Sequence, residues 1–294
     1  MLPEEHIRRN KQATLAVCLF MLILFFSIIF AFGYALGFSP ILSFAVGLPV
    51  ALLYVALSYT FSVKSVLSAA KARPANPRSR REKLFLYKVE EMAVAAGLPV
   101  PEAYVQESSD INAFATGKHP GEAIICVTTG ALEKLNGEEL EGVMSHEMSH
   151  IANRDILVST VTVGVVGAIA LIAEILLRSF FFGAGRQRGK HAAPLIIVAI
   201  IFAVLAPLLS RLAYLFMSRR REYLADANGA MLTRNPDGLA SALEKIRADL
   251  PDDPKGSRTV APLYIANPFK RSRRGSLWAT HPPLEERIKR LTAM

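Results

Sequence analysis

A long uncharged segment near the amino end is the clearest pattern in the chain. Residues 12–63 contain no charged side chain. The run is too long for the apolar region of a signal peptide, which has about 7–15 residues. It is long enough for two membrane spans of roughly 20 residues each, and the Gly- and Pro-bearing stretch 33–40 separates them. The pattern therefore predicts a transmembrane helical hairpin over 12–63, preceded by a short tail, 1–11.

Two further apolar stretches lie in the second half of the chain. Residues 156–177 carry one acidic side chain, Glu174, near their far end, and residues 192–210 are uncharged. Each is close to the length that a membrane span requires. We therefore predict a second transmembrane hairpin over 156–210, which divides the polar remainder of the chain into 64–155 and 211–294.

Basic residues beside the spans indicate their orientation. They cluster before the first span, after the second and after the fourth, whereas the turn 33–40 has none. Cytoplasmic flanks carry an excess of Lys and Arg, so the tail 1–11 and the parts 64–155 and 211–294 are expected in the cytoplasm. The turn 178–191 holds four basic residues, which weakens this orientation without reversing it.

The two polar parts alternate between helical and strand-like patterns. Apolar residues at helical spacing predict helices, and these cover 83–97, 211–234 and 235–250. Short β-rich runs predict strands, and these cover 101–108, 111–117 and 123–130. Asn136 and Glu139 form a capping-box pattern that predicts a helix leading towards the third span. Residues 71–82 are expected to be a connector, and residues 251–276 a mobile basic loop.

Composition and charge narrow the class of partner. The chain is 52% hydrophobic and carries a net charge of +9. Most of its Lys and Arg residues flank the spans, where attraction to anionic lipids explains them, and no nucleic-acid recognition module is present. The lipid bilayer, and not nucleic acid, is the expected partner. Cys18 in a span and Cys126 in a predicted strand fit a reducing compartment and argue against a disulfide framework.

The candidate chemistry lies in the stretch HEMSH, residues 146–150. Positions i and i+4 share one face of a helix, so His146 and His150 can both point a ring nitrogen at one ion. Zn²⁺ accepts neutral imidazoles and lowers the pKa of its bound water to about 7. Glu147 would take a proton from that water and deliver it to the leaving amine. The alternative is a polar helix face without chemistry.

A catalytic zinc site needs a third protein ligand. Glu222 is the best candidate, and Asp226, one turn further along, is placed to accept the free N–H of a zinc-bound histidine. Such a pair is more often a solvated helix face. The order of spans favours the metal site, because two crossings between His150 and Glu222 return the chain to one side of the membrane. Polar residues bracket the HEMSH stretch, which excludes an intramembrane protease.

These segments together resemble the HtpX family of membrane-bound zinc metalloproteases, which are relatives of the prenyl-protein (CAAX) endopeptidase. The resemblance extends over nearly the whole chain and rests on the ordered motifs AGLPVPEAYV, INAFATG, VTTGALEKLNGEELEGVMSHEMSHIANRD, RRREYLADANGA and THPPLEERI. It implies a mainly α membrane protein with four transmembrane helices and a zincin-like α+β metalloprotease domain, which combines a small β-sheet with the HExxH helix. It also implies one zinc ion per chain, bound by His146, His150 and Glu222, with Glu147 as the catalytic glutamate.

The resemblance assigns roles to three further residues. The INAFATG segment resembles an edge strand that binds the substrate backbone by β-augmentation, with Asn112 as a polar contact. The residue pattern alone indicates only an ordinary strand. His281, in THPP, is implied to lie near the metal, where it caps zinc at rest or stabilises the oxyanion, although a helix start is the simpler interpretation. Arg287 is expected to support the same site.

The function that we expect is a membrane-bound zinc endopeptidase. By resemblance it is a multi-pass protein of the bacterial inner membrane, with its active site facing the cytoplasm, and it degrades misfolded or damaged membrane proteins under stress. Its substrates are then unfolded or membrane proteins. Two alternatives remain: a prenyl-protein endopeptidase with a narrower substrate, and a non-enzymatic membrane scaffold. The sequence leaves the natural substrates and the oligomeric state open.

Overall fold

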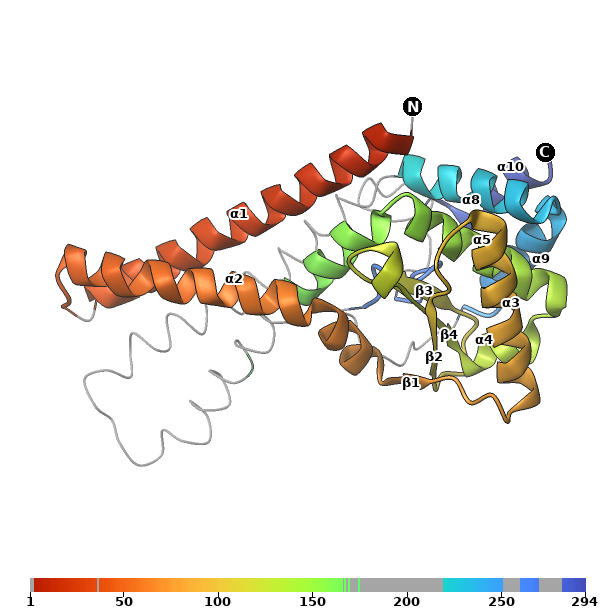
Figure 1. Ribbon diagram of the computed structural model, residues 1–294, viewed down its shortest axis with the longest axis horizontal. Coiled ribbons are helices and arrows are strands. Elements are labelled where there is room, and N and C mark those ends of the chain that lie inside the picture. Colours follow the sequence, from red (N-terminus) through yellow and green to blue (C-terminus); the bar gives the residue numbers. More distant parts are fainter. Residues whose placement is uncertain are drawn as a thin grey trace.

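Two long helices project from one side of a domain in which shorter helices surround a small sheet (Figure 1). The structure is a computed structural model of the 294-residue chain. It describes residues 3–35, 37–165, 167, 169, 174, 219–250, 260–269 and 282–294.

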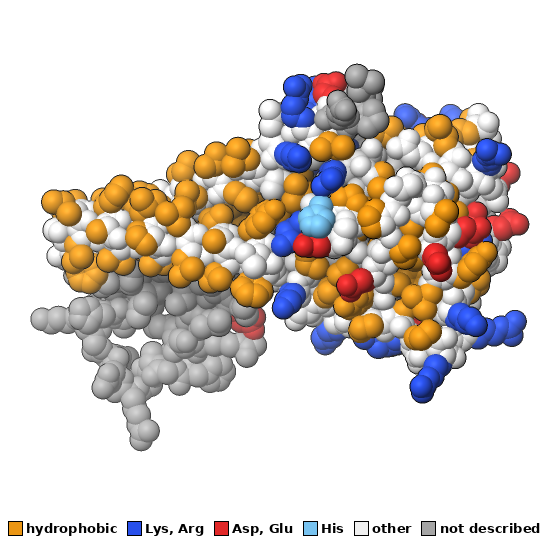
Figure 2. Space-filling model, in the orientation of Figure 1, with side chains coloured by type: hydrophobic (Ala, Val, Ile, Leu, Met, Phe, Trp, Pro, Cys, Tyr) orange, Lys and Arg blue, Asp and Glu red, His pale blue; other side chains and the backbone are white. Residues whose placement is uncertain are grey.

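The projecting pair is the predicted hairpin. Helix α1 spans Pro3–Ala35 and α2 spans Pro40–Ala70. Both contain stretches that are long and apolar enough to cross a membrane, and hydrophobic side chains cover the face of the hairpin that Figure 2 shows. The side chain of Ser39 accepts a hydrogen bond from the Leu42 N–H and so caps the start of α2. The predicted pair of apolar helices and the break between them are confirmed, and the described residues of the expected tail already belong to α1.

The second predicted hairpin falls mostly outside the described residues. A helix runs over Asp155–Val165, which is the start of the predicted third span, and the predicted fourth span, 192–210, is not among the described residues. The described part of the chain therefore contains two helices of spanning length, against the four that we expected. The helix that bears the HEMSH stretch ends at Ala152, because Arg154 adopts a φ of 59° and turns the chain before Asp155.

The sheet has four strands in the order β1-β2-β4-β3. Strands β2 (Glu102–Gln106) and β4 (Ile124–Thr128) are parallel, and β3 (Ala113–Thr116) pairs antiparallel with β4. These three strands agree with the sequence prediction. Strand β1 (Ala72–Pro74) lies in the region predicted as a connector. It was missed because three residues are too few to show an alternating pattern, and its proline is tolerated at the sheet edge.

One hydrophobic core joins the sheet to the helices of the domain. These helices are α3 (Arg80–Ala96), α4 (Thr129–Lys134), α5 (Gly137–Ala152), α8 (Arg219–Thr233), α9 (Pro236–Ala248) and α10 (Leu284–Leu291). Helix α5 lies at the centre and packs against α3, α8, α9 and β3. Its start is fixed by the predicted capping box: the Asn136 side chain accepts from the Glu139 N–H at 2.9 Å, and the Glu139 carboxylate accepts from the Asn136 N–H at 2.8 Å.

Two glycines allow neighbouring helices to approach α5 closely. A Cβ on Gly142 of α5 would lie 2.6 Å from the backbone N of Leu239 on α9. A Cβ on Gly229 of α8 would lie 3.1 Å from the backbone N of His146. The second contact brings the side chains of α8 beside the histidines of α5.

The segment 260–269 is packed against the domain. Val260, Ala261, Ile265 and Ala266 are all buried. The expectation of a mobile loop is therefore wrong for this part of 251–276, because the apolar run VAPLYIA has enough hydrophobic surface to join the core.

Candidate metal centre

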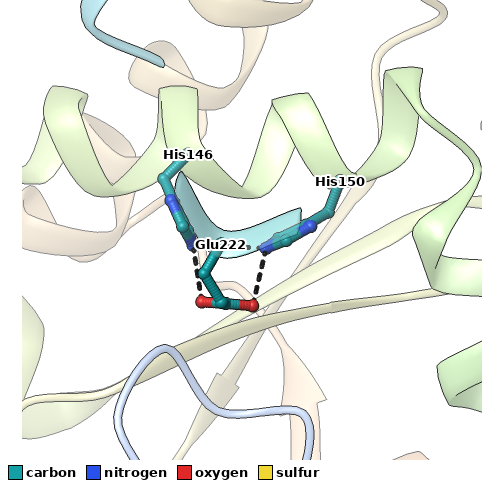
Figure 3. A group of neighbouring side chains, drawn as sticks. All are labelled: His146, His150 and Glu222. Atoms are coloured by element: carbon teal, nitrogen blue, oxygen red, sulfur yellow. Dashed lines mark hydrogen bonds and ion pairs between the residues drawn. The ribbon is translucent and has the colours of Figure 1, made fainter. Parts of the chain in front are cut away.

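Three side chains from two helices converge on one point (Figure 3). His146 and His150 lie one turn apart on α5, and Glu222 comes from the first turn of α8. The two Nε2 atoms are 3.2 Å apart. The Glu222 carboxylate faces both rings, with Oε2 at 3.8 Å from His146 Nε2 and Oε1 at 3.7 Å from His150 Nε2. One ligand atom from each residue lies within 4.8 Å of the others, so the three residues could hold a metal ion.

The chemistry and spacing of these atoms fit zinc. Imidazole nitrogens bind Zn²⁺ at about 2.0–2.1 Å in tetrahedral geometry, which places two such nitrogens about 3.3 Å apart. The observed 3.2 Å between the Nε2 atoms agrees with this spacing. Two histidines and one carboxylate leave the fourth position open, as catalytic zinc sites require.

Both histidines are oriented by carboxylates on their outer nitrogens. His146 Nδ1 lies 3.0 Å from Asp226 Oδ1, and His150 Nδ1 lies 3.0 Å from Asp155 Oδ2. A histidine that donates its Nδ1–H in this way presents the lone pair of Nε2 to a metal. The position of Asp226 agrees with the sequence prediction. Asp155 was missed, because the sequence shows it only as a polar residue between α5 and an apolar stretch.

Arg287 lies fully buried behind the site. Its Nη2 and Nε donate to the two carboxylate oxygens of Asp226 at 2.7 and 2.8 Å. Its Nη1 donates to the Ile265 carbonyl at 3.0 Å and lies 3.5 Å from Glu222 Oε2. The structure thus brings Arg287 to the site that it was expected to support, although the role itself stays a prediction.

The protonation equilibria of the two histidines differ. Burial, reinforced by the charge of Arg287, lowers the pKa of His146 to about 4. Burial also acts to lower the pKa of His150, but the hydrogen bond to Asp155 and the charge of Glu222 outweigh it and raise that pKa to about 9. In the metal-free protein, a proton is therefore held more tightly on His150 than on His146. Metal binding at this site would release the proton from His150.

Glu147 has the environment of a general base. It is buried, and its Oε1 has no hydrogen-bond partner within the described residues. Burial raises the pKa of Glu147 to about 7, and the nearby charge of Glu222 acts in the same direction. A pKa near the working pH suits a residue that must both accept and return a proton. Glu147 lines the same pocket as His146, His150 and Glu222.

The pocket adjoins the outer edge of β3. The carbonyl of Asn112 accepts from the Thr128 N–H at 3.0 Å, on the side of β4. Backbone groups alternate along an antiparallel strand, so those of Ala113 and Ala115 point away from β4. Ala115 lines the pocket. The carbonyl of Ala113 accepts from the Ile265 N–H at 2.9 Å, so the segment 260–269 lies along this edge.

Two candidate residues from the sequence remain, Asn112 and His281, and the structure describes only the first. The Asn112 side chain is buried and donates from Nδ2 to the Ala266 carbonyl at 2.9 Å. Its amide thus holds the segment 260–269, and a contact with substrate stays a prediction. His281 lies outside the described residues. Ala115 belongs to the INAFATG segment, for which the resemblance implies substrate binding, and that role stays a prediction. Ile265 was missed, because only the fold brings it to the edge of β3.

Comparisons with known proteins found related sequences and one distant structural likeness. Residues 79–294 match the model of the family described as Peptidase family M48. A "Protease HtpX homolog" of Thermoanaerobacter pseudethanolicus is 45% identical, with 100% of this chain and 97% of that protein covered. Another, of Streptococcus uberis, is 39% identical, with 99% of each covered. The crystal structure of S. mikatae Ste24p is a distant likeness, with 20% identity and a TM-score of 0.46 over 85% of this chain and 64% of that one.

Proposed function

Because this chain belongs to Peptidase family M48, we propose that His146, His150 and Glu222 bind one zinc ion and that Glu147 is the base in peptide-bond hydrolysis. The protein is a membrane-bound metalloprotease. The observation that supports zinc at this site is the spacing of 3.2 Å between the two Nε2 atoms, with the Glu222 carboxylate facing both.

The bound zinc ion would supply a Lewis acid that polarises the scissile carbonyl and acidifies water. The proton transfers belong to Glu147, whose carboxylate accepts a proton from the attacking water and passes it to the leaving nitrogen. The pKa of about 7 makes both transfers accessible near neutral pH. Asp226 and Asp155 hold the two imidazole rings in one tautomer while this happens.

The proposed substrate is an extended stretch of polypeptide that pairs with the outer edge of β3. Such pairing uses backbone hydrogen bonds, so it selects for chains that are unfolded or locally extended more than for particular side chains. The outward-facing backbone of Ala113 and Ala115 supports this mode, and Ala115 lies in the pocket of Glu147. Ile265 already donates to the Ala113 carbonyl, so a substrate that pairs along this whole edge must displace the segment 260–269.

We place this chemistry at the cytoplasmic face of a bacterial inner membrane. The support is the cluster of basic residues around the polar parts of the chain and the two apolar helices beside the domain. The proposal includes four membrane spans, a role for His281 near the zinc, and a contact between Asn112 and substrate. Degradation of misfolded or damaged membrane proteins is the role that fits a site for extended chains beside a bilayer.

The decisive experiment compares the wild type with Glu147→Gln. Each protein is purified in detergent, supplied with zinc and mixed with an unfolded model protein. The substitution removes the base and leaves the three ligands in place, so cleavage should fall by about 10²–10⁴-fold while one zinc per chain is retained. Glu138→Gln, an exposed position on the same helix, serves as the matched control and should cleave as the wild type does.

Two outcomes would count against the proposal. Equal cleavage by the wild type and Glu147→Gln would mean that Glu147 is not the base. Cleavage of a prenylated peptide but not of its unmodified counterpart would favour a narrower, prenyl-protein endopeptidase. Zinc content is measured on the same samples, so the loss of the metal is distinguished from the loss of the base.

A further inference from the structure

The first membrane helix begins beside the metal centre. Figure 1 shows the start of α1 next to the start of α8, which carries Glu222. Asn10, in the third turn of α1, is buried at this junction with 6% of its surface exposed. Asn10 falls in the tail 1–11 that the sequence pattern predicts, and no role was expected for it.

The amide of Asn10 is fully engaged by residues around the metal centre. Its Nδ2 donates to Asp155 Oδ1 at 2.8 Å and to the Asn153 carbonyl at 3.0 Å. Its Oδ1 accepts from Arg221 Nη1 at 3.4 Å. Asn10 thus ties α1 to the turn that follows α5 and to the residue that precedes Glu222.

Asp155 connects this amide to a histidine. Its Oδ1 accepts from Asn10, and its Oδ2 lies 3.0 Å from His150 Nδ1. Arg221 Nη1 lies 3.5 Å from the same Oδ1. With both oxygens occupied by fixed partners, the carboxylate has one orientation, and the imidazole of His150 is held with Nε2 towards His146 and Glu222.

We infer that Asn10 is a positioning residue of the metal centre, which acts through Asp155 on His150. The inference rests on the zinc site proposed above and adds that a residue of the membrane anchor helps to build it. A helix rises by about 1.5 Å per residue, so sliding α1 by one residue would break the bond between Asn10 and Asp155. Zinc affinity should then depend on the docking of α1 against the domain.

The test measures zinc affinity by competition with a chelator, on the full-length protein in detergent. Asn10→Leu removes the amide and keeps the number of side-chain heavy atoms, and Asn10→Ala removes it with loss of volume. Both should weaken zinc binding measurably, with an upper limit of about 10–100-fold, which is the usual effect of removing a direct partner of a metal ligand. Thr14→Val is the matched control, because Thr14 is equally buried one turn further along α1 and, among the described residues, its hydroxyl bonds only to the Asn10 carbonyl. It should stay within about threefold of the wild type.

Two further measurements separate positioning from folding. The absorption spectrum of the Co²⁺-loaded protein reports the geometry of metal coordination, and it should change in the Asn10 variants while their metal-free melting temperatures match that of Thr14→Val. Asp155→Asn should weaken zinc binding at least as much, and combining it with Asn10→Leu should add little, because the two residues act in one chain.

Each outcome is decisive. If Asn10→Leu and Asn10→Ala bind zinc as tightly as the wild type while Asp155→Asn does not, Asn10 has no positioning role and the zinc site stands. If Asn10→Leu and Asp155→Asn weaken binding by independent, multiplying factors, the connection through Asp155 is wrong. If the wild type itself binds no zinc, the proposed function fails and the inference fails with it.

Discussion

Arg287 and Asp226 form a buried, two-point ion pair behind the metal centre, with Nη2 and Nε lying 2.7 and 2.8 Å from the two carboxylate oxygens. The residues are far apart in the sequence, on α10 and α8. Asp226 Oδ1 is also the partner of His146 Nδ1. The guanidinium therefore neutralises the carboxylate that orients a proposed zinc ligand. Burial acts to raise the pKa of Asp226, but the charge of Arg287 outweighs burial and lowers that pKa to about 2.

Removing Arg287 should destabilise the fold strongly. Arg287→Met keeps most of the buried volume but leaves the charge of Asp226 without its main partner, and breaking one side of a buried ion pair costs about 3–5 kcal/mol. The free energy of unfolding in denaturant, measured in detergent, gives the effect. Lys289→Met on the exposed face of α10 is the control and should change stability by about 0.5 kcal/mol or less. Equal effects at the two positions would show that the ion pair contributes nothing.

Much of the site follows from local sequence patterns. The spacing of His146 and His150 on one helix face, the capping box at Asn136 and the position of Asp226 one turn after Glu222 are all local features, and the structure has each of them. The first hairpin could also be predicted from the sequence, because the absence of charge over residues 12–63 is a property of composition.

The remainder depends on contacts between segments distant in the sequence. Strand β1 pairs Ala72 with Gln106, and Asn10 meets Asp155 across 145 positions. No periodicity within either segment encodes its partner. The segment 260–269 was assigned to a loop because basic residues and breakers surround it, and burial of its short apolar run becomes evident only once the edge of β3 is in place beside it.

A methyl group on Gly142 should disturb the packing of α9 against α5. Alanine normally stabilises a helix interior by about 0.5–1 kcal/mol relative to glycine. At Gly142 the added Cβ would lie 2.6 Å from the backbone N of Leu239, so α9 has to move, and overpacking of this kind costs about 1–3 kcal/mol. The unfolding free energy of Gly142→Ala, compared with Gly137→Ala, measures the difference. Gly137 opens the same helix, and beyond its chain neighbours and its own helix backbone no atom of the described residues lies within 4 Å of its added Cβ. A similar loss at both positions would therefore contradict the packing argument.

The free energy of unfolding of the metal-free protein should depend on pH because of Glu147. Its folded pKa of about 7 lies above the ordinary value of 4.5, so the folded state binds this proton more tightly than the unfolded state does. The protonated carboxyl group of Glu147 stabilises the folded state. This stabilisation is fully present below pH 4.5 and is lost as the pH rises through 7. Glu147→Gln cannot ionise, so its stability relative to the wild type should increase by about 2–3 kcal/mol between pH 5 and pH 8.

Denaturant unfolding after chelation tests the role of Glu147 in this pH dependence. Wild type and Glu147→Gln are unfolded at pH 5 and at pH 8, and the difference between them is compared at the two values. The difference cancels the contributions of His146, His150 and Asp226 to the extent that these are common to both proteins. Glu138→Gln, which replaces an exposed carboxylate on the same helix, should show no comparable dependence on pH. A constant difference between wild type and Glu147→Gln would mean that Glu147 is ionised in the folded protein at pH 5.

Loosening the segment 260–269 should speed the cleavage of unfolded substrates. Tyr264 donates from its hydroxyl to Gln106 Oε1 at 2.9 Å, and its ring meets Phe114 edge-on at 5.6 Å. Tyr264→Phe keeps the ring contact and removes the hydrogen bond, worth about 1 kcal/mol. If the neighbouring Ile265 must leave the Ala113 carbonyl before a substrate can pair with β3, kcat/KM should rise by up to about fivefold, the rate equivalent of that energy.

The control is Tyr87→Phe, at an exposed tyrosine on α3, which should leave kcat/KM unchanged. A fall in kcat/KM for Tyr264→Phe at unchanged zinc content would instead make the segment a fixed wall of the substrate site, with the substrate confined to the edge beyond Ala115.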